Sequence, residues 1–269
     1  MENKAIPAIL DEEAHQRFES LFREHGWQAD HRFSGGYVEH VWANARPLIE
    51  AFAGPLGSKR VLEFGCNYGA SAIVLSHLGA VVTAVDVDAN FLQIAQANAA
   101  RFGDQTIVFQ QVPESGALPF ADASFDLITC ISVLEYVKPS LLVARLRDFD
   151  RLLKPGGTLL IMGTSSRLAP RELHSRRWLV NYLPRWVDDW TGQAMQRGVA
   201  PWLVARAFPN YADLVRADGG RRFIAAKRDA GATPAKLVAL TVLSFLAQAI
   251  GTSVGSLLPS FFFALRKPD

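Results

Sequence analysis

The chain has 269 residues, of which 49% are hydrophobic, and its 28 basic residues nearly balance its 26 acidic ones to give a net charge of +2. This hydrophobic fraction supplies a sizeable core and excludes a globally disordered chain. The near-neutral charge gives no compositional support for a nucleic-acid-binding protein. The two cysteines, Cys66 and Cys130, form neither a disulfide framework nor a metal-site pattern, so no metal is expected.

The chain begins with two predicted helices. Residues 8–26 carry apolar side chains at helical spacing, and residues 36–53 predict a second helix that ends at Gly54-Pro55. The N-terminus lacks the apolar stretch of a signal peptide, so a cytoplasmic location is expected. Residues 1–57 are therefore expected to form a helical cover.

Alternating strands and helices follow this cover. Such alternation predicts an α/β fold with a doubly wound, mostly parallel seven-stranded sheet and helices on both faces. Pro155-Gly156-Gly157 should turn the chain into the fifth strand. The expected strands are 60–64, 81–86, 106–112, 125–131 and 158–162, and the expected helices are 69–78, 90–101 and 141–153.

The alternation stops at residues 165–208, which are rich in arginine and tryptophan and predict an inserted helical lid. Four aromatic residues recur there every four positions and would form one stripe on a helix, although Pro184 should kink or restart that helix. The stripe could grip an apolar or lipid-linked ligand, rest on a membrane surface, or pack onto the domain. These aromatic residues are Trp178, Tyr182, Trp186 and Trp190.

Residues 209–269 are expected to complete the sheet, with a helix at 210–217 and strands at 221–226 and 261–265. Residues 237–265 carry no charged side chain. The apolar run from Leu237 to Ile250 is shorter than the roughly 20 residues that a membrane-spanning helix needs. It predicts a buried or interfacial helix, with peripheral membrane contact or a homodimer interface as alternatives.

Two glycines lie where the first strand turns into the following helix. Parallel sheets bind ligands at this edge, and glycine allows the backbone to approach a ligand closely. A dinucleotide fingerprint read from Gly65 would need glycine at positions 67 and 70, where Asn67 and Ala70 stand, so a nicotinamide-dependent oxidoreductase is the weaker alternative. An ordinary strand-to-helix turn containing Gly65 and Gly69 is the other interpretation.

Three segments in order resemble class I S-adenosylmethionine-dependent methyltransferases. Val61-Leu62-Glu63-Phe64-Gly65-Cys66-Asn67-Tyr68-Gly69 resembles their motif I, commonly E/D-x-G-x-G-x-G, with Asn67 in place of the middle glycine. Asparagine tolerates the left-handed backbone region that such a turn requires. Leu118-Pro119-Phe120 followed by Ser124-Phe125-Asp126 resembles the family's "LPF…SFD" block, and Leu153-Lys154-Pro155-Gly156-Gly157 resembles the turn before its fifth strand. Residues 58–164 are thus the expected cofactor-binding core.

The resemblance implies that S-adenosylmethionine is the cofactor. It implies that Asp86 binds the ribose hydroxyls and that Glu114, followed by Ser115, faces the adenine amino group. A solvated or helix-capping acid at Asp86, and a surface acid at Glu114, are the alternatives. The expected cofactor-binding set is Glu63, Gly65, Cys66, Asn67, Gly69, Asp86, Val87, Glu114, Ser115 and Ile131.

The family has no universal catalytic residue, so candidates rest on position. Glu135 and Tyr136 follow the fourth strand, where the family often has glutamate-histidine. His174 lies in the insertion and His31 in the cover, and histidine suits a general base because it titrates near neutrality. Each of these residues could instead be a surface or packing side chain. The cover also holds His40, as a further base candidate, and Arg32 and Tyr37, which could meet the methionine end of the cofactor.

These features predict methyl transfer to a small-molecule, lipid or glycan-precursor acceptor by in-line displacement. A methyltransferase-like binding subunit without catalysis is the alternative from another class. A nucleic-acid acceptor is not expected, because Ser132-Val133-Leu134-Glu135 stands where an Asn/Asp-Pro-Pro-Tyr-like block would follow the fourth strand. The expected location is cytoplasmic, with peripheral attachment to the inner face of the membrane as an alternative.

Overall fold

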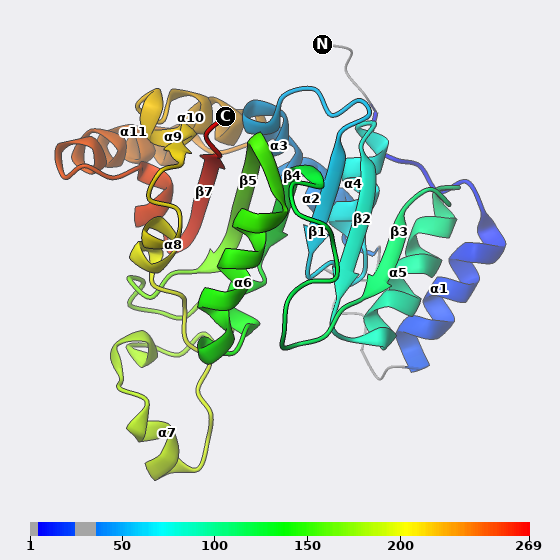
Figure 1. Cartoon of the computed structure of the whole chain (residues 1–269), viewed down its shortest axis with the longest axis horizontal. Helices are drawn as coiled ribbons and strands as arrows, with labels where there is room; N and C mark the ends of the chain where they lie inside the picture. The colour runs from blue at the N-terminus through cyan, green and yellow to red at the C-terminus, as the bar shows by residue number, and fades with distance from the viewer. Residues whose placement is uncertain (1–4, 25–35) are drawn as a thin grey trace.

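Seven strands form a single sheet at the centre of the computed structural model, which describes residues 5–24 and 36–269 (Figure 1). The strands are β1 Arg60–Phe64, β2 Val81–Asp86, β3 Val108–Gln111, β4 Phe125–Ile131, β5 Leu153–Ser165, β6 Ala212–Asp213 and β7 Ser260–Arg266.

The strand order is β3-β2-β1-β4-β5-β7-β6. The first five strands are mutually parallel, whereas β7 pairs antiparallel with both β5 and β6. The chain leaves β1 toward β2 and β3 on one side and later returns to β4 on the other. This switch point between β1 and β4 lies at the carboxyl ends of the strands, the place where open α/β sheets bind ligands in a crevice. This expected binding place is called the crevice below. The predicted fold class is confirmed.

Helices cover both faces of the sheet, and three short 3₁₀ turns connect elements. The helices are α1 Glu12–Glu24, α2 Val38–Asn44, α3 Arg46–Ala53, α4 Ala70–His77, α5 Ala89–Arg101, α6 Pro139–Leu152, α7 Trp186–Thr191, α8 Pro201–Ala207, α9 Leu214–Ala217, α10 Arg221–Asp229 and α11 Pro234–Ala249, and the 3₁₀ turns are η1 Leu134–Tyr136, η2 Val180–Tyr182 and η3 Val254–Leu257.

Alternate residues of each central strand enter two separate cores. In β7, Phe262 and Ala264 join the core beneath α2, α3, α4 and α10, whereas Phe261, Phe263 and Leu265 join the core beneath α6 and α8. Successive side chains of a strand point to opposite faces, so a strand covered on both sides must be apolar at every position. This requirement explains the uninterrupted apolar sequence of β7.

The first helix of the chain packs beside α5 at the β3 end of the sheet (Figure 1). Phe18 and Phe22 of α1 form a small separate core with Ile94 and Ala97 of α5. The guanidinium of Arg101 lies 4.1 Å from the centre of the Phe18 ring, in a cation–π contact. A helix was predicted here from residue 8, and it begins at Glu12.

The prediction of one helix over residues 36–53 is wrong. Two helices, α2 and α3, meet at Ala45, and Pro47 lies in the first turn of α3. Proline lacks the backbone N–H that a continuous helix would need, and its ring clashes with the preceding turn. The first turn of a new helix is the position that tolerates it.

The strand predicted at residues 221–226 is also wrong, because these residues lie in α10. Phe223 and Ala226, three positions apart, face the core. Spacing of three places side chains on one face of a helix, whereas a strand would need spacing of two. The helix predicted at 210–217 is reduced to the two-residue strand β6 and the single-turn helix α9, because Asp213 caps α9 by accepting from the N–H groups of Val215 and Arg216.

Residues 167–198, here called the arm, leave the sheet at the end of β5 and return to the same point. Ser166 and Val199 form a parallel β-bridge that closes the neck of this excursion. The predicted interruption at Pro184 is present, because the chain forms η2, an extended break through Pro184, and then α7. Figure 1 shows α7 projecting away from the sheet.

The expected apolar helix is present as α11. Leu240, Ser244 and Ala247 face inward, and the opposite side of the helix is exposed. Across residues 5–24 and 36–269, no helix combines the length and the hydropathy that crossing a bilayer requires.

Candidate active site

The turn after β1 adopts the left-handed conformation that its sequence predicts. Gly65, Asn67 and Gly69 have φ angles of 74°, 47° and 75°. Asn67 replaces a glycine in the common motif, and its side-chain oxygen accepts a hydrogen bond from the backbone N–H of Tyr68 at 2.7 Å. Asparagine is one of the few residues that can take this conformation. The turn is therefore preserved although its sequence departs from the common motif.

Both glycines are also required by close packing. A Cβ atom on Gly65 would lie 2.5 Å from the side chain of Val133, which follows β4. A Cβ atom on Gly69 would lie 3.0 Å from that of Ala95 and 3.2 Å from the ring of Phe109. The turn is therefore held tightly between neighbouring strands and α5, which fixes the floor of the crevice.

Every backbone N–H of residues 65–69 is hydrogen-bonded within the protein. Gly65 and Cys66 both donate to the carbonyl of Val85, Gly69 donates to the carbonyl of Cys66, Asn67 donates to the Asp86 carboxylate, and Tyr68 donates to the Asn67 side chain. A phosphate-binding glycine loop needs N–H groups that point at the anion. The N–H groups of this turn are therefore not available to a phosphate.

The acid of the motif lies beneath the turn and not at its surface. Glu63 is fully buried and accepts hydrogen bonds from the hydroxyls of Ser71 and Thr129. Burial raises the pKa of Glu63 to about 7, although both hydroxyl hydrogen bonds lower it. Glu63 thus ties β1 to β4 and to α4, and its predicted contact with the cofactor stays a prediction.

The carboxylate of Asp86 lies at the end of β2 beside the turn. It accepts hydrogen bonds from the backbone N–H of Asn67 at 2.9 Å and of Asp88 at 3.1 Å. Burial raises the pKa of Asp86 and outweighs these hydrogen bonds, which lower it. A carboxylate has about four acceptor positions, so those that remain suit a pair of hydroxyl groups. The helix-capping role belongs to Asp88, which accepts from the N–H of Asn90 at 2.8 Å.

The remaining predicted cofactor-binding residues lie at the ends of β2 and β4 or on the loop after β3. Val87 is exposed directly after Asp86, and Ile131 is partly buried at the end of β4. Glu114 and Ser115 lie on an exposed loop, where the Glu114 carboxylate forms an ion pair with the ammonium of Lys138 at 2.7 Å. Cys66 differs from this group because its thiol is buried in the core, so only its backbone borders the crevice.

A buried ion pair that the sequence analysis missed positions the loop of residues 113–118. The guanidinium of Arg145 pairs with Asp148 at 3.1 Å and donates to the backbone carbonyl of Glu114 at 2.9 Å. Asp148 in turn accepts from the backbone N–H of Leu118 at 3.1 Å. Both residues lie on the inner face of α6, and a charged pair at helical spacing among apolar neighbours was the available indication.

The structure brings two catalytic candidates together after β4. The Nε2 atom of His174, from the arm, lies 2.8 Å from the Oε1 atom of Glu135, whose side chain is completely buried. The ring of Tyr136 lies against that of His174, with centroids 5.3 Å apart. Oε2 of Glu135 has no hydrogen-bond partner among the residues that the structure describes. Sequence separation hid this arrangement, since the two partners are 39 positions apart.

Two further arm residues hold this pair in place. Glu172 is buried, and its Oε2 atom accepts from the backbone N–H of His174 at 2.9 Å and from that of Ser175. Burial raises the pKa of Glu172, but the hydrogen bonds from Ser175 and the charge of His174 outweigh burial and keep the pKa below its usual value. The side-chain amide of Gln196 donates to the backbone carbonyl of Glu135 at 2.9 Å. Neither residue was predicted.

Some predicted positions lie elsewhere. His31 and Arg32 fall outside the described residues. Tyr37 has a left-handed backbone at the start of α2, and its ring stacks on that of His40 at 4.3 Å. The roles predicted for Tyr37 and His40 stay predictions.

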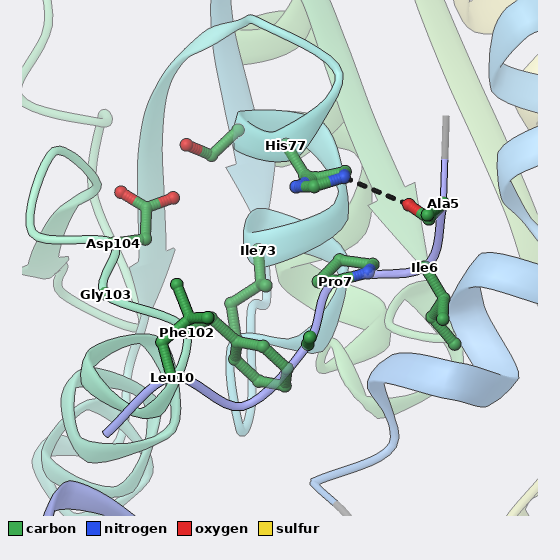
Figure 2. Close-up of a pocket in the computed structure, with 11 residues that line it drawn as sticks. Ala5, Ile6, Pro7, Leu10, Ile73, His77, Phe102, Gly103 and Asp104 are labelled. Carbon is green, nitrogen blue, oxygen red and sulfur yellow. Dashed lines mark hydrogen bonds between the residues drawn. The ribbon is translucent and has the colours of Figure 1, made fainter. Parts of the chain in front are cut away.

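A cavity of about 520 Å³ lies at the other edge of the sheet (Figure 2). Its walls come from residues 5–10, from the C-terminal end of α4 and from the turn after α5. Figure 2 shows His77 directed toward the carbonyl oxygen of Ala5, at 3.1 Å. Because α4 and α5 end where the parallel strands begin, this cavity is separate from the crevice at the carboxyl ends.

Part of the chain is similar in sequence to known proteins. Residues 62–161 match the family model described as a methyltransferase domain. The chain is 36% identical over 103 residues to the ubiquinone biosynthesis O-methyltransferase of Paracidovorax citrulli, covering 38% of this chain and 42% of that protein. It is 38% identical over 108 residues to the demethylmenaquinone methyltransferase of Tropheryma whipplei, covering 40% and 43%.

A solved structure shares the fold. The S-adenosylmethionine dependent methyltransferase from Mesorhizobium loti aligns with 82% of this chain and 96% of its own, with a TM-score of 0.51 and 19% identity. At that identity the likeness concerns the fold alone. The chain spans about half the length of the curated relatives it matches, so their names do not by themselves give the activity of this chain.

Proposed function

We propose, from the premise that residues 62–161 form a methyltransferase domain on the fold of class I S-adenosylmethionine-dependent methyltransferases, that this protein methylates a hydroxyl oxygen of a small apolar acceptor. The single observation that carries the proposal is the arrangement at the carboxyl ends of β1, β2 and β4. There, a turn whose backbone N–H groups are hydrogen-bonded internally, the Asp86 carboxylate and the Glu135–His174 pair lie at one edge of the sheet.

The crevice fits S-adenosylmethionine better than a dinucleotide. The N–H groups of residues 65–69 are all hydrogen-bonded internally, which suits a cofactor without phosphate. Asp86 would accept the ribose hydroxyls, and Glu114 with Ser115 would face the adenine. When bound, this cofactor supplies a methyl group already activated by its sulfonium charge.

The Glu135–His174 pair supports an oxygen acceptor. A hydroxyl near neutral pH keeps its proton, so a general base is needed to make it nucleophilic. His174, with its Nε2 atom 2.8 Å from the buried Glu135 carboxylate, would be the base that takes the acceptor's proton. Glu135 then stabilises the imidazolium that forms, as the carboxylate does in other His-carboxylate pairs.

The relatives support an apolar acceptor. The Paracidovorax citrulli protein is named for ubiquinone biosynthesis and the Tropheryma whipplei protein for demethylmenaquinone. Such acceptors reside in membranes, which favours peripheral attachment to the inner face of the membrane over a purely cytoplasmic location. A lipid or a glycan precursor as the acceptor is also consistent with this proposal. A homodimer formed through α11 remains a prediction.

Calorimetry tests the cofactor assignment. Wild-type protein should bind S-adenosylmethionine and show no binding of reduced nicotinamide dinucleotide. Asp86→Ala should weaken S-adenosylmethionine binding at least about tenfold, since hydrogen bonds to a charged group contribute about 1.5–3 kcal/mol. Tighter binding of the nicotinamide cofactor would instead favour the oxidoreductase alternative.

Asp88→Ala is the matched control for Asp86→Ala. It removes a neighbouring carboxylate that caps α5 and should lower the free energy of unfolding by about 1 kcal/mol. The affinity for S-adenosylmethionine should stay at the wild-type value. Equal loss of affinity in both variants would mean that the effect is structural.

Labelled methyl transfer tests the acceptor. The protein is incubated with methyl-labelled S-adenosylmethionine and a cell extract, which is then separated into lipid and aqueous phases for mass spectrometry. Label in a methoxy group of the lipid phase is expected. Cofactor binding without label in either phase would favour the non-catalytic binding subunit.

A further inference from the structure

We propose that the arm, residues 167–198, is a docking surface for a bilayer containing anionic phospholipid. The proposal that the arm is a docking surface is based on the geometry of the arm alone. Only its consequence, that an apolar acceptor reaches the crevice directly from the membrane, rests on the proposed function.

The interior of the arm is polar. Asn181 is fully buried, donates to the carbonyls of Ser166 and Ala169, and accepts from the N–H of Gly198 at 2.8 Å. Arg197 is buried and forms a two-pronged ion pair with Asp188, at 2.6 and 2.7 Å. Hydrogen bonds and an ion pair, more than apolar packing, therefore order this segment.

The exterior of the arm is apolar. Trp178, Trp186 and Trp190 are 68%, 64% and 80% exposed. Tyr182 also has an exposed ring, while its hydroxyl donates inward to the carbonyl of Leu168 at 2.7 Å. Soluble proteins bury such side chains, so polar groups inside and aromatic groups outside indicate a surface that faces a partner. The other exposed apolar side chains of the arm are Leu168, Leu173, Leu179 and Leu183.

Tryptophan and tyrosine are the residues that accumulate at the boundary between lipid and water. Each has an apolar ring for the acyl region and a polar atom for the headgroups. A flat protein interface would bury these rings in matching pockets. The arm instead extends into solvent (Figure 1), as an element that enters a fluid layer can.

The exposed charge of the arm complements anionic headgroups. Of its acidic residues, Glu172 is buried and Asp188 is paired with Arg197, which leaves Asp189 as the exposed carboxylate. The arm also carries four exposed arginines. Their long side chains can place guanidinium groups at the level of the lipid phosphates while the aromatic rings enter the lipid. These arginines are Arg171, Arg176, Arg177 and Arg185.

The arm is attached at the crevice. Its neck is the Ser166–Val199 bridge at the end of β5, and His174 contacts Glu135 directly after β4. A bilayer beneath the arm would therefore face the carboxyl edge of the sheet, where the acceptor must enter. This position explains why the segment is inserted here and not elsewhere in the chain.

A second copy of this chain is the less suitable occupant. A twofold interface places the same patch against itself, so the arginines of both copies would approach one another. Another exposed apolar surface, on α11, lacks charged residues from 237 to 250 and is separate from the arm, with α11 at the upper left of Figure 1 and α7 at the lower left. Val242, Phe245 and Ile250 of that face provide the comparison surface for the test.

Vesicle sedimentation of the full chain tests the proposal. Vesicles of phosphatidylcholine with 30% phosphatidylglycerol should bind the wild type, and pure phosphatidylcholine vesicles should bind it more weakly. Trp186→Ala/Trp190→Ala should lose at least about tenfold in partitioning, because two large apolar surfaces no longer enter the lipid. Arg176→Ala/Arg177→Ala should lose about 30-fold on the anionic vesicles, at roughly fivefold for each arginine, and little on the neutral ones.

Phe245→Ser is the control variant. It removes an equally exposed aromatic side chain from α11 and should leave vesicle binding unchanged. All variants should keep the wild-type affinity for S-adenosylmethionine, so a failure of docking is distinguished from a failure of the proposed function. Three outcomes overturn the proposal: wild type that binds neither vesicle, binding that survives both arm variants, or gel filtration showing a dimer that the arm variants dissociate.

Discussion

The carboxyl group of Glu63 is buried under the glycine turn with two hydroxyl donors. Its pKa in the folded protein is about 7, against 4.5 for an ordinary glutamate. Between these values the folded protein holds a proton that the unfolded chain releases. The stability that protonated Glu63 contributes at low pH is therefore lost as pH rises from about 4.5 through 7.

Glu63→Gln should remove this pH dependence. The difference in free energy of unfolding between Glu63→Gln and wild type should rise by about 3 kcal/mol, in favour of the variant, from pH 4.5 to pH 8. Urea denaturation at several pH values measures it. Glu12→Gln, an exposed carboxyl-to-amide change on α1, should show no such trend, and a constant difference for Glu63→Gln would contradict the assignment.

His174→Gln tests the proposed base. The rate of label transfer should fall by about 100-fold or more, because the acceptor keeps its proton. The rate-versus-pH profile should also lose the limb that a histidine produces near neutrality. Calorimetric affinity for S-adenosylmethionine should not change.

His77→Gln serves as the matched control for His174. His77 lies at the opposite edge of the sheet, by the cavity of Figure 2. This variant should keep the wild-type rate and pH profile. A His174→Gln enzyme with an unaltered profile would show that the histidine only packs against Glu135.

At the scale of elements, α6 positions a loop that it does not contain. Arg145 donates to the carbonyls of Pro113 and Glu114 while it pairs with Asp148. A guanidinium can do this because its planar group carries five donors, whereas a lysine ammonium cannot span the same acceptors.

Arg145→Lys should therefore loosen residues 113–116 without leaving Asp148 unpaired. The affinity for S-adenosylmethionine, measured by calorimetry, should fall by about five- to 30-fold, corresponding to one or two lost hydrogen bonds of about 1 kcal/mol each. Arg147→Lys, an exposed change on the same helix, should have no effect. Unchanged affinity in Arg145→Lys would remove this loop from the cofactor site.

At the scale of the whole molecule, the arm is energetically separate from the sheet. None of the three apolar cores contains a residue between 167 and 198. The sheet should therefore fold without the arm, although the two ends of the neck run parallel and need a connection of about a dozen residues.

Replacement of residues 170–195 by a twelve-residue Gly/Ser linker tests this separation. The melting temperature should change by less than about 5 °C, which corresponds to about 1–2 kcal/mol for a chain of this size. S-adenosylmethionine should still bind, while label transfer should be lost together with His174. Calorimetry measures both stability and binding, and an unfolded variant would contradict the independence of the arm.

The sequence by itself determined the parallel core. Buried strands such as β1 and β2 are short, predominantly apolar segments, and the left-handed positions at Gly65, Asn67 and Gly69 require residues that tolerate positive φ. These features are local, because backbone sterics and strand burial act over a few residues. The parallel core, the turn and the place of Asp86 at the end of the second strand could therefore be predicted.

The tertiary structure alone decided the rest, because it depends on residues far apart in the chain. Nothing near Arg221–Asp229 indicated that Phe223 would meet Phe262 of β7, so a helix was taken for a strand. The pairing of Glu135 with His174, the support from Glu172 and the polar interior of the arm all arise where the neck closes. Local patterns carry no information on such contacts, since the same aromatic stripe is compatible with burial or with exposure.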